Sequence, residues 1–168
     1  MGEDKAKEQV GMPGWSIGTM RFDASIGEAA LEIAIAEIGQ GEDGRNNITK
    51  YSTTEGPWCA AFVAWCLKKA AVALQRTLPF EPSAGARKLF SQIASAGTLV
   101  TWPRPGDVVC WRRGRARSWQ GHIGFVESST PQGLIETVEG NVGTFPAHVR
   151  RFTHDPSYER IVGYARIV

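Results

Sequence analysis

Cys59 is the residue best suited to nucleophilic chemistry, because it lies near the start of a predicted helix, GPWCAAFVAWCLKKA (residues 56–70). Pro57 suits the first helical position, so Cys59 falls in the first turn, where backbone N–H groups lack intrahelical partners. These N–H groups and the positive end of the helix dipole stabilise a thiolate, the nucleophilic form of cysteine. The alternative is a buried structural cysteine, because Cys59 shares an apolar stripe at helical spacing with Phe62 and Cys66.

A cysteine nucleophile needs a base, and His122 is the strongest candidate among the three histidines. It lies in QGHIGFVES (residues 120–128), where the glycines on either side leave room for the imidazole at the mouth of an apolar strand. His148 lies close to an arginine pair and His154 lies in a predicted turn, THDP, so we expect both to be surface residues. Cys59 and His122 together therefore predict a catalytic cysteine–histidine pair.

The strand predicted after His122, LIETVEGN (residues 134–141), offers a group to orient the imidazole. Side chains alternate along a strand, so Glu136 and Glu139 point to opposite faces and only one of them can face the cleft. Glu139, at the strand end, is the predicted acceptor of the His122 N–H; Asn141 is the alternative for this role or for positioning a substrate. A carboxylate here would raise the basicity of His122 and favour a thiolate–imidazolium pair.

Helices are predicted in the first half of the chain. Ser25 and Glu28 form a capping-box pattern before a helix that ends at Gly39, and Ser83 begins a third helix that ends at Gly97. Between the first helix and Cys59 runs a long segment rich in glycine, asparagine and threonine (residues 39–56). Long loops in compact domains are often functional, so we expect this one to form a wall of the cleft.

The second half changes to short segments rich in β-branched and aromatic residues: 107–111, 123–128, 134–139, 148–152 and 161–167. Helices followed by strands predict an α+β domain, with the cysteine helix packed on one face of an antiparallel sheet. Residues 1–22 follow no clear period and are predicted to be a tail or arm, which leaves residues 23–168 as a single domain.

Composition limits the possible cofactors and partners. A net charge of +2 is too small to predict nucleic-acid binding, and no window is apolar enough for a membrane span or a secretory signal. The cysteines show no zinc-ligand spacing, so we expect neither a metal nor a cofactor. Cys66 and Cys110 are predicted to be buried thiols, and a disulfide between them is the alternative.

Four motifs occur in order: PWCAAFVAWCL, PRPGDVVCW, GHIGFVES and IETVEGN. Together they resemble the CHAP domain, the cysteine, histidine-dependent amidohydrolase/peptidase module of the NlpC/P60 papain-like group, over roughly residues 29–168. The resemblance implies a papain-like α+β fold and a peptidoglycan substrate, cut between muramic acid and L-alanine or within the stem peptide and its crosslinks.

The resemblance also implies roles for individual residues. Cys59 would be the nucleophile, His122 the general base and then acid, and Glu139 the orienting residue, with Asn141 assisting. Many NlpC/P60 enzymes use a second histidine in the third position, and its absence here favours the CHAP branch.

With no signal peptide expected, the protein would be made in the cytoplasm and reach the cell wall as a phage lysin or as a secreted antibacterial effector. An immunity or inhibitor protein is a partner to test for. Two other functions compete: a toxin-like cysteine hydrolase or deamidase acting on a protein, and a non-catalytic wall-binding module. The basic segment RRGRARSW (residues 112–119) either binds anionic wall polymers or forms a solvated hairpin tip.

Overall fold

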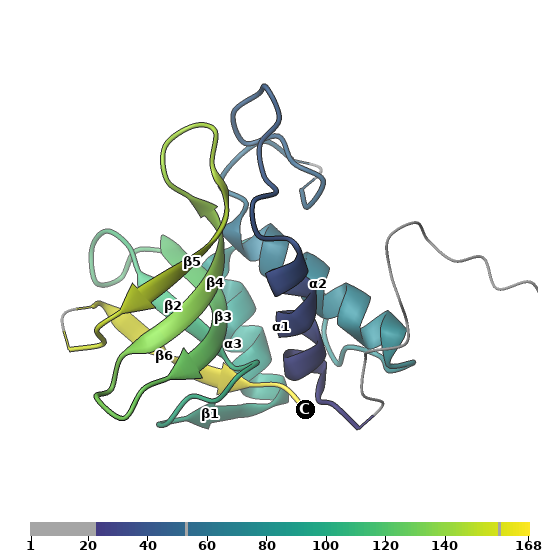
Figure 1. Ribbon diagram of the computed structural model, residues 1–168, viewed down its shortest axis with the longest axis vertical. Helices are drawn as coiled ribbons and strands as arrows, with labels where there is room; N and C mark the ends of the chain where they lie inside the picture. The colour runs from purple at the N-terminus through teal and green to yellow at the C-terminus, as the bar shows by residue number, and fades with distance from the viewer. Residues whose placement is uncertain (1–22, 53, 158) are drawn as a thin grey trace, which may run out of the picture.

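The computed structural model describes residues 23–52, 54–157 and 159–168, so the predicted N-terminal tail lies outside the described residues. Three helices pack beside a single curved sheet (Figure 1). The helices are α1 (Ile26–Ala36), α2 (Cys59–Ala73) and α3 (Ala86–Ala96). The strands are β1 (Thr98–Val100), β2 (Val108–Arg112), β3 (Gly121–Ser129), β4 (Ile135–Val142), β5 (His148–His154) and β6 (Ile161–Arg166). This arrangement confirms the predicted α+β fold.

The sheet has the strand order β1-β6-β2-β3-β4-β5, and every neighbouring pair is antiparallel. Strands β2 to β5 therefore form a meander, while β6 lies between β1 and β2. Arg166 in β6 reinforces this placement, because its guanidinium donates two hydrogen bonds of 2.7 Å to the Asp107 carboxylate just before β2. The meander brings β3 and β4, which carry His122 and Glu139, side by side.

Several element boundaries differ from the predictions. The capping box at Ser25 and Glu28 is present, but α1 ends at Ala36 rather than Gly39. Ser83 does not cap α3; its Oγ instead accepts a hydrogen bond from the N–H of Gly85, the residue that precedes the helix. Strand β1 was not predicted, because two of its three residues are exposed and it shows no apolar alternation.

The main core lies between the helices and the sheet. Phe62 and Leu67 of α2 are fully buried there, together with Phe125 of β3 and Val138 of β4. Each such side chain contributes roughly 1.5–3 kcal/mol through burial. A smaller apolar cluster is formed by Val109, Trp111, Val126 and Ile135, which alternate in sequence with the main-core residues and so lie on the opposite face of the sheet.

Cys66 and Cys110 are both free and buried, which confirms the predicted thiols and excludes the disulfide. Burial raises the pKa of Cys66 and raises that of Cys110 to about 12, so both stay neutral near pH 7. Within the described part of the chain, no helix combines the length and apolar character needed to cross a bilayer.

Candidate active site

Cys59 is the first residue of α2, with Trp58 at the N-cap position, so the helix begins two residues after Pro57 rather than at it. The first backbone hydrogen bond of the helix runs from the N–H of Phe62 to the carbonyl of Trp58, at 2.9 Å. The N–H of Cys59 consequently has no intrahelical partner and is available to an anion. Placement of Cys59 in the first turn agrees with the prediction.

A buried carboxylate fixes the chain just before Cys59. Trp58 is fully buried, and its Nε1–H donates to Glu42 Oε1 at 3.1 Å. Glu42 also accepts from the backbone N–H groups of Asn47 and Ala147, both at 2.9 Å. Burial raises the pKa of Glu42, but these donors outweigh it, so the pKa is lowered. Glu42 was not singled out in the sequence, because its partners are scattered along the chain.

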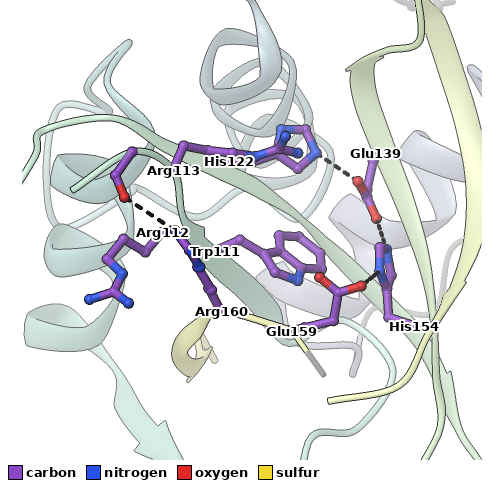
Figure 2. Close-up of a pocket in the computed structure, with 9 residues that line it drawn as sticks. Trp111, Arg112, Arg113, His122, Glu139, His154, Glu159 and Arg160 are labelled. Atoms are coloured by element: carbon purple, nitrogen blue, oxygen red, sulfur yellow. Dashed lines mark hydrogen bonds and ion pairs between the residues drawn. The ribbon is translucent and has the colours of Figure 1, made fainter. Parts of the chain in front are cut away.

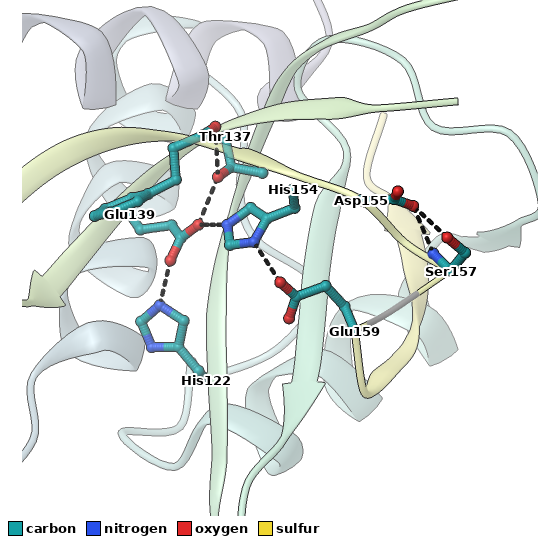
Figure 3. A network of polar contacts seen from close by, with 8 residues as sticks. His122, Thr137, Glu139, His154, Asp155, Ser157 and Glu159 are labelled. Carbon is teal, nitrogen blue, oxygen red and sulfur yellow. Dashed lines mark hydrogen bonds and ion pairs between the residues drawn. The ribbon is translucent and has the colours of Figure 1, made fainter. Parts of the chain in front are cut away.

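His122 and Glu139 form a buried hydrogen-bonded pair. His122 Nε2 lies 2.6 Å from Glu139 Oε2, and the two residues are only 6% and 2% exposed (Figure 3). The Cys59 side chain also interacts with His122 and helps to raise its pKa, and Nδ1 is the ring nitrogen that Glu139 leaves free for the sulfur. The structure therefore brings together the predicted nucleophile, base and orienting carboxylate.

Charge pairing dominates the protonation of this pair. Burial lowers the pKa of His122, but its interactions with Cys59 and Glu139 outweigh burial and raise the pKa to about 9. Burial raises the pKa of Glu139, yet its hydrogen bonds to His122 and His154 reduce it to about 2. At neutral pH the site thus holds an imidazolium and a carboxylate.

Gly124 makes room for the Glu139 carboxylate rather than for the His122 imidazole. A Cβ at Gly124 would lie 2.6 Å from Glu139 Cγ and 3.0 Å from the carbonyl oxygen of Val138. The missing side chain therefore lets Glu139 lie flat across β3 and reach His122. The prediction that this glycine clears space was right, but the occupant of the space is Glu139.

Glu136 and Asn141, the other two candidate residues on β4, are not placed as Glu139 is. Glu136 is exposed and accepts a hydrogen bond from Ser128 Oγ at 2.6 Å, so only Glu139 faces His122, as the alternation predicted. Asn141 follows Glu139 at a β-bulge and has a positive φ of 60°. Its side chain makes no hydrogen bond to any described residue. Glu139 thus takes the third position, and assistance by Asn141 stays a prediction.

His154 was predicted to be a surface residue, and this prediction was wrong. Its ring is largely buried against Trp111, with the two ring centroids 4.9 Å apart. His154 Nε2 lies 2.6 Å from Glu139 Oε1, the carboxylate oxygen that also accepts from Thr137 Oγ1 at 2.5 Å. The turn signal in THDP concealed this contact, because His154 is the last residue of β5 before the turn begins.

Two cavities border the site. One, of about 440 Å³, is lined by Cys59, by Glu55 and Gly56 of the predicted cleft loop, and by Gly85, Trp119 and Gln120. The other, of about 400 Å³, is lined by His122, Glu139 and His154 (Figure 2). Arg113 lines both cavities, so they are adjacent. The cleft loop prediction is confirmed.

Comparison with known proteins decides the family. A family model described as the CHAP domain matches residues 51–141, just over half of the chain. The chain belongs to the CHAP family. This CHAP segment contains Cys59, His122 and Glu139, and CHAP domains are generally cysteine amidases or peptidases. The resemblance deduced from the four motifs is therefore confirmed.

A solved structure, that of NlpC2 from Trichomonas vaginalis, is similar to this CHAP protein with a TM-score of 0.57 and 13% sequence identity. The match covers 91% of this chain, which spans half the length of the NlpC2 chain. At this identity the likeness establishes the papain-like fold alone. No curated protein matches the sequence.

Proposed function

We propose that this protein hydrolyses an amide bond of bacterial peptidoglycan through a covalent intermediate on Cys59. The observation that carries the proposal is that Cys59, at a helix N-terminus, interacts with His122, which in turn is hydrogen-bonded to Glu139. Membership of the CHAP family supports a cysteine amidase or peptidase, and the cell-wall substrate is the proposed step beyond it.

In the first half of the reaction, the Cys59 thiolate attacks the carbonyl carbon of the amide. The carbonyl oxygen becomes an oxyanion, for which the unpaired N–H of Cys59 is a donor at the positive end of α2. When the C–N bond breaks, the His122 imidazolium gives its proton to the leaving amine. A thioester on Cys59 and a neutral imidazole remain.

In the second half, neutral His122 takes a proton from water, and the resulting hydroxide attacks the thioester carbonyl. The C–S bond breaks, the acyl group leaves as a carboxylic acid, and the thiolate–imidazolium pair is restored. Glu139 keeps its charge throughout, because its role is to hold the imidazole and stabilise its protonated form.

The proposal is tested by incubating purified sacculi with wild-type protein and with Cys59→Ala, and by mass spectrometry of the soluble fragments. Fragments are expected only with the wild type, and their masses identify the amide that is cut. Glu139→Gln should lose most activity, whereas Glu136→Gln, on the same strand but facing away, is the matched control and should keep it. Folding of each variant is checked by circular dichroism.

Failure of the wild type to release fragments from any wall type would overturn the cell-wall assignment and favour a hydrolase or deamidase acting on a protein. Equal binding to walls by wild type and Cys59→Ala, without products, would favour a non-catalytic module. Delivery as a lysin or a secreted effector, and an inhibitor partner, stay predictions.

A further inference from the structure

Each ring nitrogen of His154 is in contact with a carboxylate. Nε2 lies 2.6 Å from Glu139 Oε1, and Nδ1 lies 3.2 Å from Glu159 Oε1. A neutral imidazole has only one N–H, and an ionised carboxylate can only accept a hydrogen bond. Both contacts are made at once only when His154 is an imidazolium. The same two contacts raise the pKa of His154 above its ordinary value.

Glu139 is therefore a carboxylate held between two cationic rings. Oε2 accepts from His122, while Oε1 accepts from His154 and Thr137 (Figure 3). Three donors on two oxygens fix both the position and the plane of the carboxylate. Trp111 supports this arrangement, because its ring contacts both imidazoles. The ring centroids are 5.5 Å apart for His122 and 4.9 Å apart for His154.

From this geometry we propose that His154, held by Glu159, is a positioning residue. It fixes the Glu139 carboxylate and weakens the electrostatic attraction of Glu139 for the His122 proton. Along the chain of contacts the two imidazolium rings, His122 and His154, alternate with the two carboxylates, Glu139 and Glu159. This inference rests on the catalytic roles of Cys59 and His122 in the proposed function, but not on the identity of the substrate.

The physical reason for this role is that His122 has to meet two opposing requirements. It must be protonated to pair with the thiolate, yet it must release that proton to the leaving amine. Glu139 alone would bind the His122 proton tightly in a buried site. A second cation on the same carboxylate offsets part of its negative charge. This lowers the proton affinity of His122, so its proton is released more easily.

Several charged groups surround His154. Glu139 and Glu159 contact His154 directly, and His122 contacts Glu139. Three arginines line the same cavity: Arg112, Arg113 and Arg160 (Figure 2). Guanidinium groups are not deprotonated in proteins. Changes between pH 6 and 10 therefore come from the other groups of the site, His122 and His154 among them.

The test is an NMR titration of the His122 imidazole in wild type, His154→Gln and Glu159→Gln. Gln can still donate a hydrogen bond to Glu139 but carries no charge, so His154→Gln isolates the electrostatic role. The titration midpoint of His122 is expected to shift to higher pH in His154→Gln, and by less in Glu159→Gln. The matched control is His148→Gln, which removes the other histidine of β5, one that has no contact with Glu139.

Fragment release provides the second readout. His154→Gln is expected to reduce the rate roughly tenfold to a hundredfold, and His154→Phe, which removes both donor and charge, by more. An unchanged or lower His122 midpoint in His154→Gln would overturn the inference, as would a rate equal to that of His148→Gln. Because the titration needs no substrate, it separates failure of this inference from failure of the cell-wall assignment.

Discussion

Replacing Glu139 by Gln should change how the stability of the fold depends on pH. The pKa of Glu139 falls from 4.5 to about 2 in the folded protein. Since a tenfold change in proton affinity is worth ~1.4 kcal/mol, the ionised form contributes on the order of 3 kcal/mol to folding. The raised pKa of His122 describes largely the same interaction, so the two shifts are not added.

The sign follows from the lowered pKa. Above pH 4.5 Glu139 is ionised in both folded and unfolded chains, and its full contribution is present. As pH falls toward 2 the unfolded state binds the proton first, so stability is lost. Between pH 5 and pH 3 the loss from this one carboxylate is about 2 kcal/mol.

Urea unfolding at a series of pH values measures this effect. The wild type should lose about 2 kcal/mol more than Glu139→Gln between pH 5 and pH 3. Glu136→Gln changes an exposed carboxylate on the same strand and should follow the wild-type curve. Parallel curves for wild type and Glu139→Gln would refute the argument, because they would mean that Glu139 is not held as an anion by its donors.

Three further predictions concern the site. Cys59→Ala should abolish fragment release and leave the melting temperature within a few degrees of wild type, because it removes one sulfur at a cavity wall. Gly124→Ala should destabilise the protein by roughly 1–3 kcal/mol and greatly slow the reaction, since the new methyl group displaces Glu139; unfolding curves and rates check both effects. Trp119 is 80% exposed at the Cys59 cavity, so Trp119→Ala should raise KM for soluble wall fragments at least several-fold. Trp102 is equally exposed, at 81%, but does not line that cavity, and Trp102→Ala should leave KM unchanged; equal effects would contradict a substrate contact at Trp119.

Local patterns were enough to predict part of the site. A cysteine two residues after a proline and the alternation along LIETVEGN placed Cys59 in a first helical turn and separated Glu139 from Glu136. These features depend on helix and strand geometry within a few residues. The order of helices and strands likewise predicted the α+β layers.

Contacts across the sheet could not be predicted in the same way. His154 lies opposite Ile135 in the β4–β5 register, and this pairing puts it on the face of Thr137 and Glu139. The register depends on the hairpin between the strands and on the bulge after Glu139, neither of which has a strong sequence signal. Knowledge of that register alone would have identified His154. Glu42 was missed for a similar reason, because one of its donors, the N–H of Ala147, is 105 residues away.

The position of β6 between β1 and β2 has a consequence for synthesis of the protein on the ribosome. Both neighbours of β6, the strands β1 and β2, emerge long before it does. Until Ile161–Arg166 has been made, β2 has an unpaired edge and Asp107 lacks its guanidinium partner. An open edge next to apolar strands favours pairing with other chains. The nascent chain therefore completes its sheet only once β6 has emerged, and it is most exposed to aggregation just before that point.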